Sequence, residues 1–248
     1  MRAMALVGCV ISLICFVGFP SACLSQRADA TMNDKPMIRY DANGIPNFIK
    51  GENLSASLDT DLFFRDLKKK NRYADIAFYF LDSQRALFKL TSARDEFVVK
   101  KITSVTMARK HIKLQQVFHD LPVWGMQVTI HLDKSNRVYC LQGHYQPISP
   151  RLNTRPAITR EAACRQALRT RPHPLQWRIQ QATAFIWAPS DADQRLVYIV
   201  TLMKNGIYRE RCFVDAFDGS LLRCLSATPD NRRPPMSQHR RGLKSLQQ

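Results

Sequence analysis

The sequence predicts an α+β protein of two small units, each with a helix packed on an antiparallel sheet, after an N-terminal signal segment. Three observations support this prediction. An apolar segment opens the chain, helical periodicity is followed by strand periodicity, and this order of helix and strands occurs twice. Without the signal, about 220 residues remain, which is enough for two small domains with cores of their own.

The first residues have the pattern of an export signal. Arg2 precedes an uncharged run from Ala3 to Gln26 with a strongly apolar centre. A short basic start before such a run is typical of a secretory signal. A retained membrane anchor is the alternative, because the run approaches the roughly 20 residues that cross a bilayer. The small residues and Pro20 that follow favour processing.

The site of processing has two interpretations. Residues 20–23 resemble a bacterial lipoprotein box that would make Cys23 a lipidation site, although Pro20 stands where Leu is usual. Cleavage near Ser25, or after Ala30, would release a soluble product. We therefore expect residues 1–25 to be a signal peptide or lipoprotein signal, and the protein to reach the periplasm, the cell envelope or the exterior.

The charge balance favours anionic partners. The chain has 37 Lys and Arg against 20 Asp and Glu, a formal net charge of +17. Such an excess attracts anionic surfaces over long range, but export makes nucleic acid the least expected partner. The basic residues are scattered, and a solvated surface explains them equally well. Residues 228–248 are predicted to be a disordered basic tail.

Four cysteines remain beyond the signal: Cys140, Cys164, Cys212 and Cys224. An oxidising compartment permits disulfides, and four cysteines allow three pairings. If residues 217–219 form a three-residue turn, Ala216 faces Ser220 and Cys212 faces Cys224. Free buried thiols are an equal alternative.

The first unit is expected over residues 45–146. Residues 31–54 are polar and irregular, 55–68 weakly helical, and 73–81 form an amphipathic helix. Alternation then predicts a hairpin of strands 111–118 and 124–132 joined at 119–121. A third strand, 137–141, follows a turn at 134–136. Trp124 shares a face with a long apolar row, which favours its burial.

The second unit is expected over residues 157–227, after a Pro-rich linker at 147–156. Thr159 is suited to cap a helix that contains Ala163, Cys164, Ala167 and Leu168. Strands are expected around 185–187, 196–202, 207–216 and 221–225. Asp215 and Asp218 are assigned to a turn with Gly219 rather than to a catalytic carboxylate pair.

The histidines suggest a metal site that we do not favour. If Phe118 pairs with Pro122, His111 lies opposite Thr129 and diagonal to His131, and Asp133 shares their face. This spacing matches no known metal-binding signature, and an exposed polar face is the simpler interpretation. Cys140 and Cys164 lack a Cys-x-x-Cys arrangement. We therefore assign no catalytic residue, no metal ligand and no cofactor.

The residues of the predicted hairpin and third strand resemble those of a known protein family. Residues 111–143 are similar to the fungalysin/thermolysin propeptide motif, with its places held by His111, Lys113, Gln116, Phe118, Pro122, Val123, Gly125, His131 and Gly143. Pro122 suits a strand end, and Gly125 within a strand suggests a bulge or close backbone approach. Asp120 stands where Gly is usual, and Ser135-Asn136 replaces the commoner Asp-Gly turn; Asn and Asp tolerate unusual dihedrals.

The second unit resembles a PepSY domain, in which a helix precedes strands that end in Asp-Ala-x-x-Gly, here Asp215, Ala216 and Gly219. The resemblance covers residues 45–226, in the order found in propeptides of thermolysin-like metalloproteases. The zinc-binding helix with His-Glu-x-x-His does not occur in these 248 residues, and a peptidase of this family needs it.

The resemblance implies a non-catalytic protein that binds a thermolysin-like metalloprotease in trans, as an inhibitor, a folding assistant or both. One alternative is a cell-envelope protein that binds anionic lipid or polymer. The net charge of +17 favours this alternative. Another is a truncated remnant of a thermolysin-family protease.

Overall fold

The computed structural model describes residues 35–106 and 109–227. By its internal contacts, the chain divides between residues 34 and 35, so both predicted units lie in the part Lys35–Gln248. The predicted signal segment with Cys23 and the predicted basic tail therefore lie outside the described residues. Within the described part of the chain, no helix is long and apolar enough to cross a membrane.

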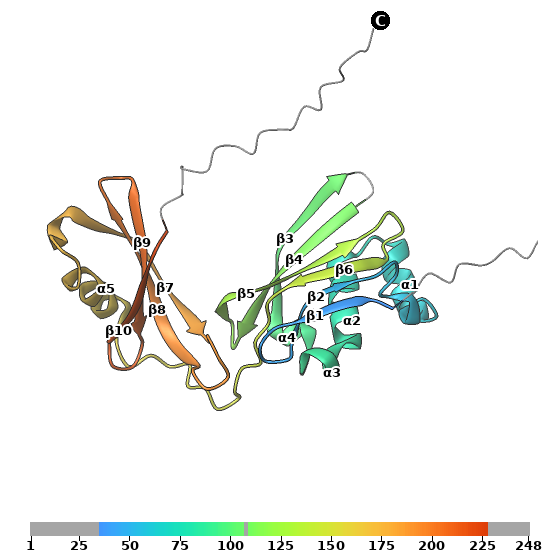
Figure 1. The fold of residues 1–248 in the computed structure, drawn as a ribbon, viewed down its shortest axis with the longest axis horizontal. Helices are drawn as coiled ribbons and strands as arrows, with labels where there is room; N and C mark the ends of the chain where they lie inside the picture. The colour runs from blue at the N-terminus through green and yellow to red at the C-terminus, as the bar shows by residue number, and fades with distance from the viewer. Residues whose placement is uncertain (1–34, 107–108, 228–248) are drawn as a thin grey trace, which may run out of the picture. The chain divides into compact units, whose positions relative to one another are not determined.

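The first half of the described chain builds an antiparallel sheet with the strand order β1-β2-β6-β5-β4-β3 (Figure 1). Its strands are β1 (Met37–Tyr40), β2 (Pro46–Lys50), β3 (Phe97–Thr106), β4 (Arg109–Phe118), β5 (Leu121–Leu132) and β6 (Val138–Gly143). β1 and β2 correct the expectation that residues 31–54 are irregular. Their turn is organised by the Asp41 carboxylate, which accepts from the backbone N–H groups of Asn43 and Ile45 at 2.9 Å.

Short helices cover one face of this sheet: η1 (Ala56–Leu58), α1 (Leu62–Lys69), α2 (Tyr73–Ser83), α3 (Arg85–Phe88) and α4 (Ala93–Glu96). α2 confirms the predicted amphipathic helix, and its residues Ile76, Ala77, Phe80 and Leu81 are buried. Asp61 starts α1 because its side chain accepts from the N–H groups of Phe63 and Phe64. The helices and the sheet thereby enclose one apolar core.

The second half forms an antiparallel meander of β7 (Trp177–Trp187), β8 (Arg195–Lys204), β9 (Tyr208–Asp215) and β10 (Leu221–Ser226), in that order. α5 (Arg160–Arg169) packs on it through the buried side chains of Ala163, Cys164 and Ala167. As predicted, Thr159 caps α5 by accepting from the N–H of Ala162 at 3.2 Å. A 3-10 turn, η2 (Pro174–Gln176), precedes β7. The α+β fold class is confirmed, while β7 begins eight residues before the expected strand.

Candidate interaction surface

The β4–β5 hairpin has a different register from the one we predicted. His119 and Asp120 both have positive φ, 48° and 65°, and form a two-residue turn that pairs Phe118 with Leu121. The predicted partner of Phe118 was Pro122, which instead pairs with Val117. Beyond that pair, a wide irregularity in β5 shifts the register again.

Glutamines fill this irregularity. The Gln115 side chain donates to the carbonyl oxygens of Val123 and Met126 at 2.8 and 3.0 Å, and it accepts from the side chain of Gln127 at 2.8 Å. Gly125 lies within the irregularity at φ 78°, and a β-carbon added there would meet no atom within 4 Å. The position requires glycine for its backbone conformation rather than for space.

The shifted register brings His111 directly opposite His131, which corrects the predicted pairing of His111 with Thr129. The two rings are 4.1 Å apart at their centroids. His131 is only 8% exposed and its Nε2 atom has no hydrogen-bond partner. Burial, with a further contribution from His111, lowers the pKa of His131 to about 4. His131 is therefore neutral near pH 7.

The third group considered for a metal, Asp133, is engaged in the next turn. Its carboxylate accepts from the backbone N–H groups of Ser135 and Arg137 and from the Arg137 side chain, at 2.8–2.9 Å. These contacts and the Arg137 charge lower its pKa against the opposing effect of burial. Among the described residues, the one group of three suitable side chains is Glu210, Cys212 and Cys224, none of which belongs to the histidine pair.

Gln116 binds the backbone of the segment that follows β6. It is 1% exposed, donates through Nε2 to the carbonyl of Gln146 at 2.6 Å, and accepts from the N–H of Gln146 at 3.1 Å. The Gln146 side chain continues the network to Asn43 and to Asp191, in the loop between β7 and β8. Gln116 thus joins three segments that are far apart in the sequence.

Gly143 is required by a close backbone approach. At φ 142°, an added β-carbon would lie 2.0 Å from the carbonyl oxygen of Gln127 and 2.7 Å from the Cα atom of Val128. Both of those atoms belong to the neighbouring strand and cannot move without disturbing the sheet.

Asp215, Ala216 and Gly219 organise the β9–β10 turn. The Asp215 carboxylate accepts from the N–H of Phe217 at 2.8 Å, and Gly219 has φ 76°. Ala216 accepts through its carbonyl from the N–H groups of Ala157 and Ile158, which anchors the segment before α5. The turn is one residue longer than predicted, because Asp215, rather than Ala216, is bonded to Ser220.

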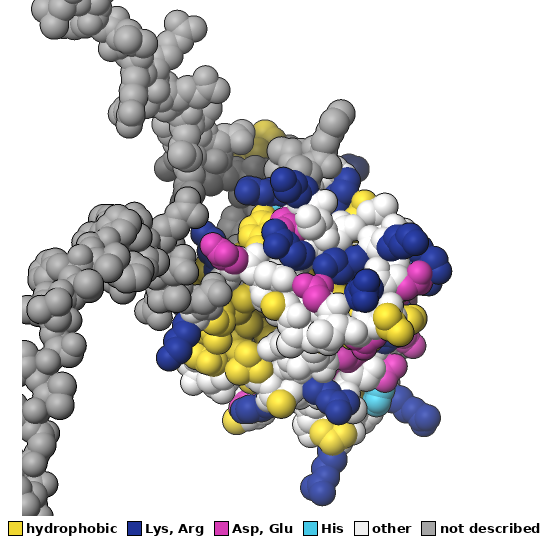
Figure 2. All heavy atoms as spheres, turned by 90° about the vertical axis from the view of Figure 1, so that its right-hand side faces the viewer, with side chains coloured by type: hydrophobic (Ala, Val, Ile, Leu, Met, Phe, Trp, Pro, Cys, Tyr) yellow, Lys and Arg dark blue, Asp and Glu magenta, His cyan; other side chains and the backbone are white. Residues whose placement is uncertain are grey.

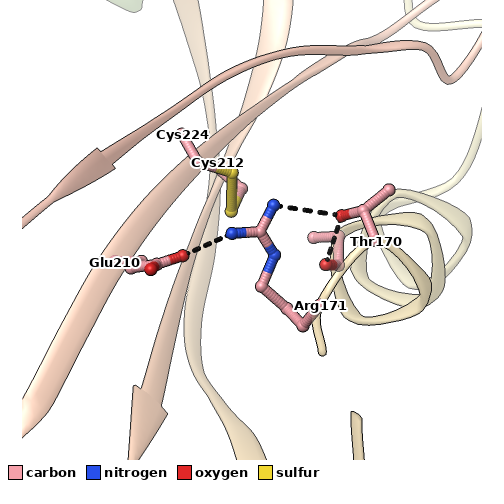
Figure 3. Close-up of a disulfide and its surroundings, with 6 residues drawn as sticks. Thr170, Arg171, Glu210, Cys212 and Cys224 are labelled. Carbon is pink, nitrogen blue, oxygen red and sulfur yellow. Dashed lines mark hydrogen bonds and ion pairs between the residues drawn. A yellow bond between two sulfur atoms is a disulfide. The ribbon is translucent and has the colours of Figure 1, made fainter. Parts of the chain in front are cut away.

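An irregularity in β10 between Leu221 and Arg223 then restores the register in which Cys212 faces Cys224. The structure joins these two cysteines by a disulfide, so their sulfur atoms are not available to a metal. Figure 3 shows the guanidinium of Arg171 beside this disulfide, between the end of α5 and β9. Arg171 Nη1 donates to the Glu210 carboxylate at 2.6 Å. Cys140 and Cys164 are free and buried, and burial raises the pKa of both thiols.

The end of the β4–β5 hairpin contributes to the core of the second sheet. Val123 is fully buried and forms a parallel bridge with Ile186 of β7. Phe118, Leu121 and Met126 pack against the same apolar cluster. Trp124 is only partly buried and makes edge contacts with the rings of Phe185 and Phe213, at 5.4 and 5.3 Å. The hairpin therefore serves two cores.

β3 presents the longest free edge of the first sheet. It is ten residues long, and among the described residues it pairs with β4 alone. Val99 pairs with Leu114, and Ile102 pairs with Ile112. Leu114 and Ile112 belong to the apolar core, so Val99 and Ile102 extend its cross-strand rows to the sheet edge. At the sheet edge they are 39% and 42% exposed. A strand added beside β3 would complete its backbone hydrogen bonds and bury these side chains.

On the face that Figure 2 shows, basic side chains are not gathered into a single patch. Figure 2 shows Lys and Arg distributed over the visible face and interspersed with Asp and Glu. Several acids of the described chain are ion-paired, such as Asp75 with Arg72 and Arg94. The overall positive charge therefore acts as a diffuse field on this face rather than as a defined anion site.

Comparison with known proteins places residues 95–145, which contain β3 to β6, in the fungalysin/thermolysin propeptide motif. A bacillolysin from Brevibacillus brevis is 25% identical to this chain over 100 residues, which are 38% of this chain and 19% of that protein. The match thus spans about a fifth of the bacillolysin's length. The expected resemblance to propeptides of this family is confirmed for the first unit.

Among solved structures, the C-terminal domain of Bacillus megaterium YpeB covers 73% of this chain and 71% of its own, with 12% identity and a TM-score of 0.34. A TM-score of this size does not establish a common fold. The PepSY-like character of residues 157–227 therefore stays a prediction, as do the boundaries of the two units and the linker at 147–156.

Proposed function

We propose that this chain is an exported, non-catalytic protein that binds a thermolysin-like metalloprotease in trans, as an inhibitor, a folding assistant or both. The observation that carries the proposal is the propeptide motif at residues 95–145, whose first strand, β3, is a free sheet edge. A partner chain could bind such an edge by adding a strand to it.

The edge has the properties of a strand acceptor. Val98, Val99 and Ile102 are exposed apolar side chains on a ten-residue strand. Irregularities after Val99 and after Ser104 interrupt this edge, so a partner strand would pair with the regular segments between them. Two lysines lie between Val99 and Ile102 and would favour an acidic partner segment during encounter. Backbone pairing would supply affinity, and the apolar side chains would supply register.

The test uses the chain from residue 26 onward and a thermolysin-like protease from the same organism. We expect a micromolar excess to lower peptidase activity or to raise the yield of protease refolded from denaturant. Ile102→Lys should weaken the effect about tenfold, because a strand that docks on β3 would bury a charge beside it. Leu62→Lys is the matched control, since Leu62 is an exposed apolar residue on α1.

Both variants should keep the unfolding midpoint of the parent chain, which thermal unfolding verifies. Unchanged protease activity and refolding yield with the parent chain would refute the proposal. Equal effects of the two variants would refute β3 as the contact while leaving the function in place.

A further inference from the structure

A second interaction surface lies at the end of the second sheet where β7 begins, β8 ends and β9 begins. Two loops meet here, η2 and the β8–β9 turn at residues 205–207, because Leu175 and Gln176 line the same hollow as Asn205 and Gly206. We call this end the loop tip. It also contains the end of β10, where Ser226 pairs with Glu210.

The loop tip exposes three large apolar side chains. Leu175 is fully exposed, and Ile207 and Tyr208 are 68% and 57% exposed. A single exposed apolar residue is ordinary on a protein surface, whereas these three lie at one end of the sheet: Leu175 in η2, Ile207 in the β8–β9 turn and Tyr208 at the start of β9. Several exposed apolar side chains at one end of a sheet indicate a binding surface.

The two loops that carry these side chains are braced. Trp177 donates through its indole N–H to the carbonyl of Pro172 at 3.3 Å, and the Arg171–Glu210 ion pair ties the end of α5 to β9 (Figure 3). Asn205 and Gly206 have positive φ and close a tight turn, in which Ile207 donates to the carbonyl of Lys204 at 3.2 Å. These contacts fix the backbone of the loops from which Leu175 and Ile207 project.

The surroundings of these side chains are strongly basic. Arg169 and Arg178 are exposed near the two loops, and Lys204 lies beside them over the Trp177 ring. The nearby carboxylate of Glu210 is paired with Arg171, whereas Arg211 lies over the Trp124 ring. The last described residue, Ala227, is bonded to Arg209 at this end, and the 21 residues that follow it contain five Lys or Arg and one Asp.

We propose that the loop tip docks on an anionic lipid bilayer. Leu175 and Ile207 would enter the region beneath the headgroups, Trp177 and Tyr208 would lie at the interface, and Lys204 and Arg178 would contact lipid phosphates. Projecting apolar side chains with a basic surround fit a lipid surface. This inference is independent of the proposed binding of a protease, which we assign to β3.

The experiment is co-sedimentation of the chain from residue 26 onward with large vesicles of phosphatidylglycerol and phosphatidylcholine in equal amounts. Leaving out residue 23 removes any contribution of a lipid at Cys23. We expect binding at low salt that weakens as salt is added, and no binding to pure phosphatidylcholine. Absence of binding to the anionic vesicles at low salt would overturn the proposal.

Variants locate the contact. The double variant Leu175→Ser with Ile207→Ser should bind about tenfold more weakly or worse, because two apolar side chains no longer leave water. Leu62→Ser, an exposed leucine on α1, should bind like the parent chain. Arg178→Gln should reduce the salt dependence more than Arg85→Gln, an exposed arginine of α3.

Two results would refute the loop tip as the lipid contact. One is vesicle binding by the double variant as strong as that of the parent chain. Loss of binding on removal of residues 228–248 would then assign the lipid contact to that segment. The other is loss of protease inhibition by the double variant with vesicle binding retained, which would make the loop tip a protein contact. Retained dependence on Leu175 and Ile207 in the chain that lacks residues 228–248 would support the proposal.

Discussion

Acidification should destabilise this protein through one buried histidine. His131 is 8% exposed, sits against His111, and has a pKa of about 4 in the folded chain. In the unfolded chain a histidine has a pKa of about 6.5. Because the folded pKa is the lower one, the unfolded state binds the proton first, and stability present above pH 6.5 is lost as the pH falls toward 4.

The two pKa values set the magnitude. Their difference corresponds to about 3 kcal/mol when both states are fully protonated, and about 2 kcal/mol of this is lost between pH 8 and pH 5. Other groups titrate in the same interval, so the quantity to measure is the difference between the parent chain and His131→Leu. The variant lacks the titrating group and should lose about 2 kcal/mol less over that interval.

The assay is urea unfolding followed by tryptophan fluorescence at pH 8, 7, 6 and 5. His119→Asn is the control for removing a histidine, because His119 is exposed and asparagine tolerates its positive φ. If the parent chain and His131→Leu lose equal stability between pH 8 and pH 5, His131 is accessible to protons in the folded state and the reasoning is wrong.

Three further changes test the architecture by urea unfolding. Replacing Cys212 and Cys224 with alanine should cost about 3 kcal/mol, the chain-entropy value for a 12-residue separation; the denatured chain from residue 26 should show two free thiols before reduction and four after it. Gly143→Ala should cost about 3 kcal/mol or more, because its β-carbon would meet backbone at 2.0 Å; parent-like stability would contradict the close approach. Gln116→Leu should cost about 2 kcal/mol, because it leaves the buried N–H and carbonyl of Gln146 unpaired; a neutral effect would show that water replaces the amide.

The helix and hairpin content was predictable because it depends on local periodicity. The apolar spacing of residues 73–81 indicated α2, and Thr159 before a short apolar pattern indicated α5. β1 and β2 were missed because β2 joins the sheet through β6, which lies about ninety residues later, and short strands carry little period of their own.

The register of the candidate site could not be predicted. A single glycine, Gly125, was the one sequence signal of the irregularity that places His111 opposite His131. Its extent depends on Gln115, whose side chain donates to the carbonyl groups of Val123 and Met126 and is itself held by the side chain of Gln127. In the β9–β10 turn, two errors cancelled: the turn is longer than expected, and the irregularity in β10 returns Cys212 to Cys224.

The hairpin that serves two cores limits how this protein can be dissected. A fragment that stops at residue 146 would contain the whole propeptide motif, yet it would expose Phe118, Leu121 and Val123 to water. The complementary fragment would lack part of its own interior. Sequence motifs and folding units therefore have different borders in this chain. Binding studies with isolated halves would measure non-specific association through exposed core side chains rather than specific recognition.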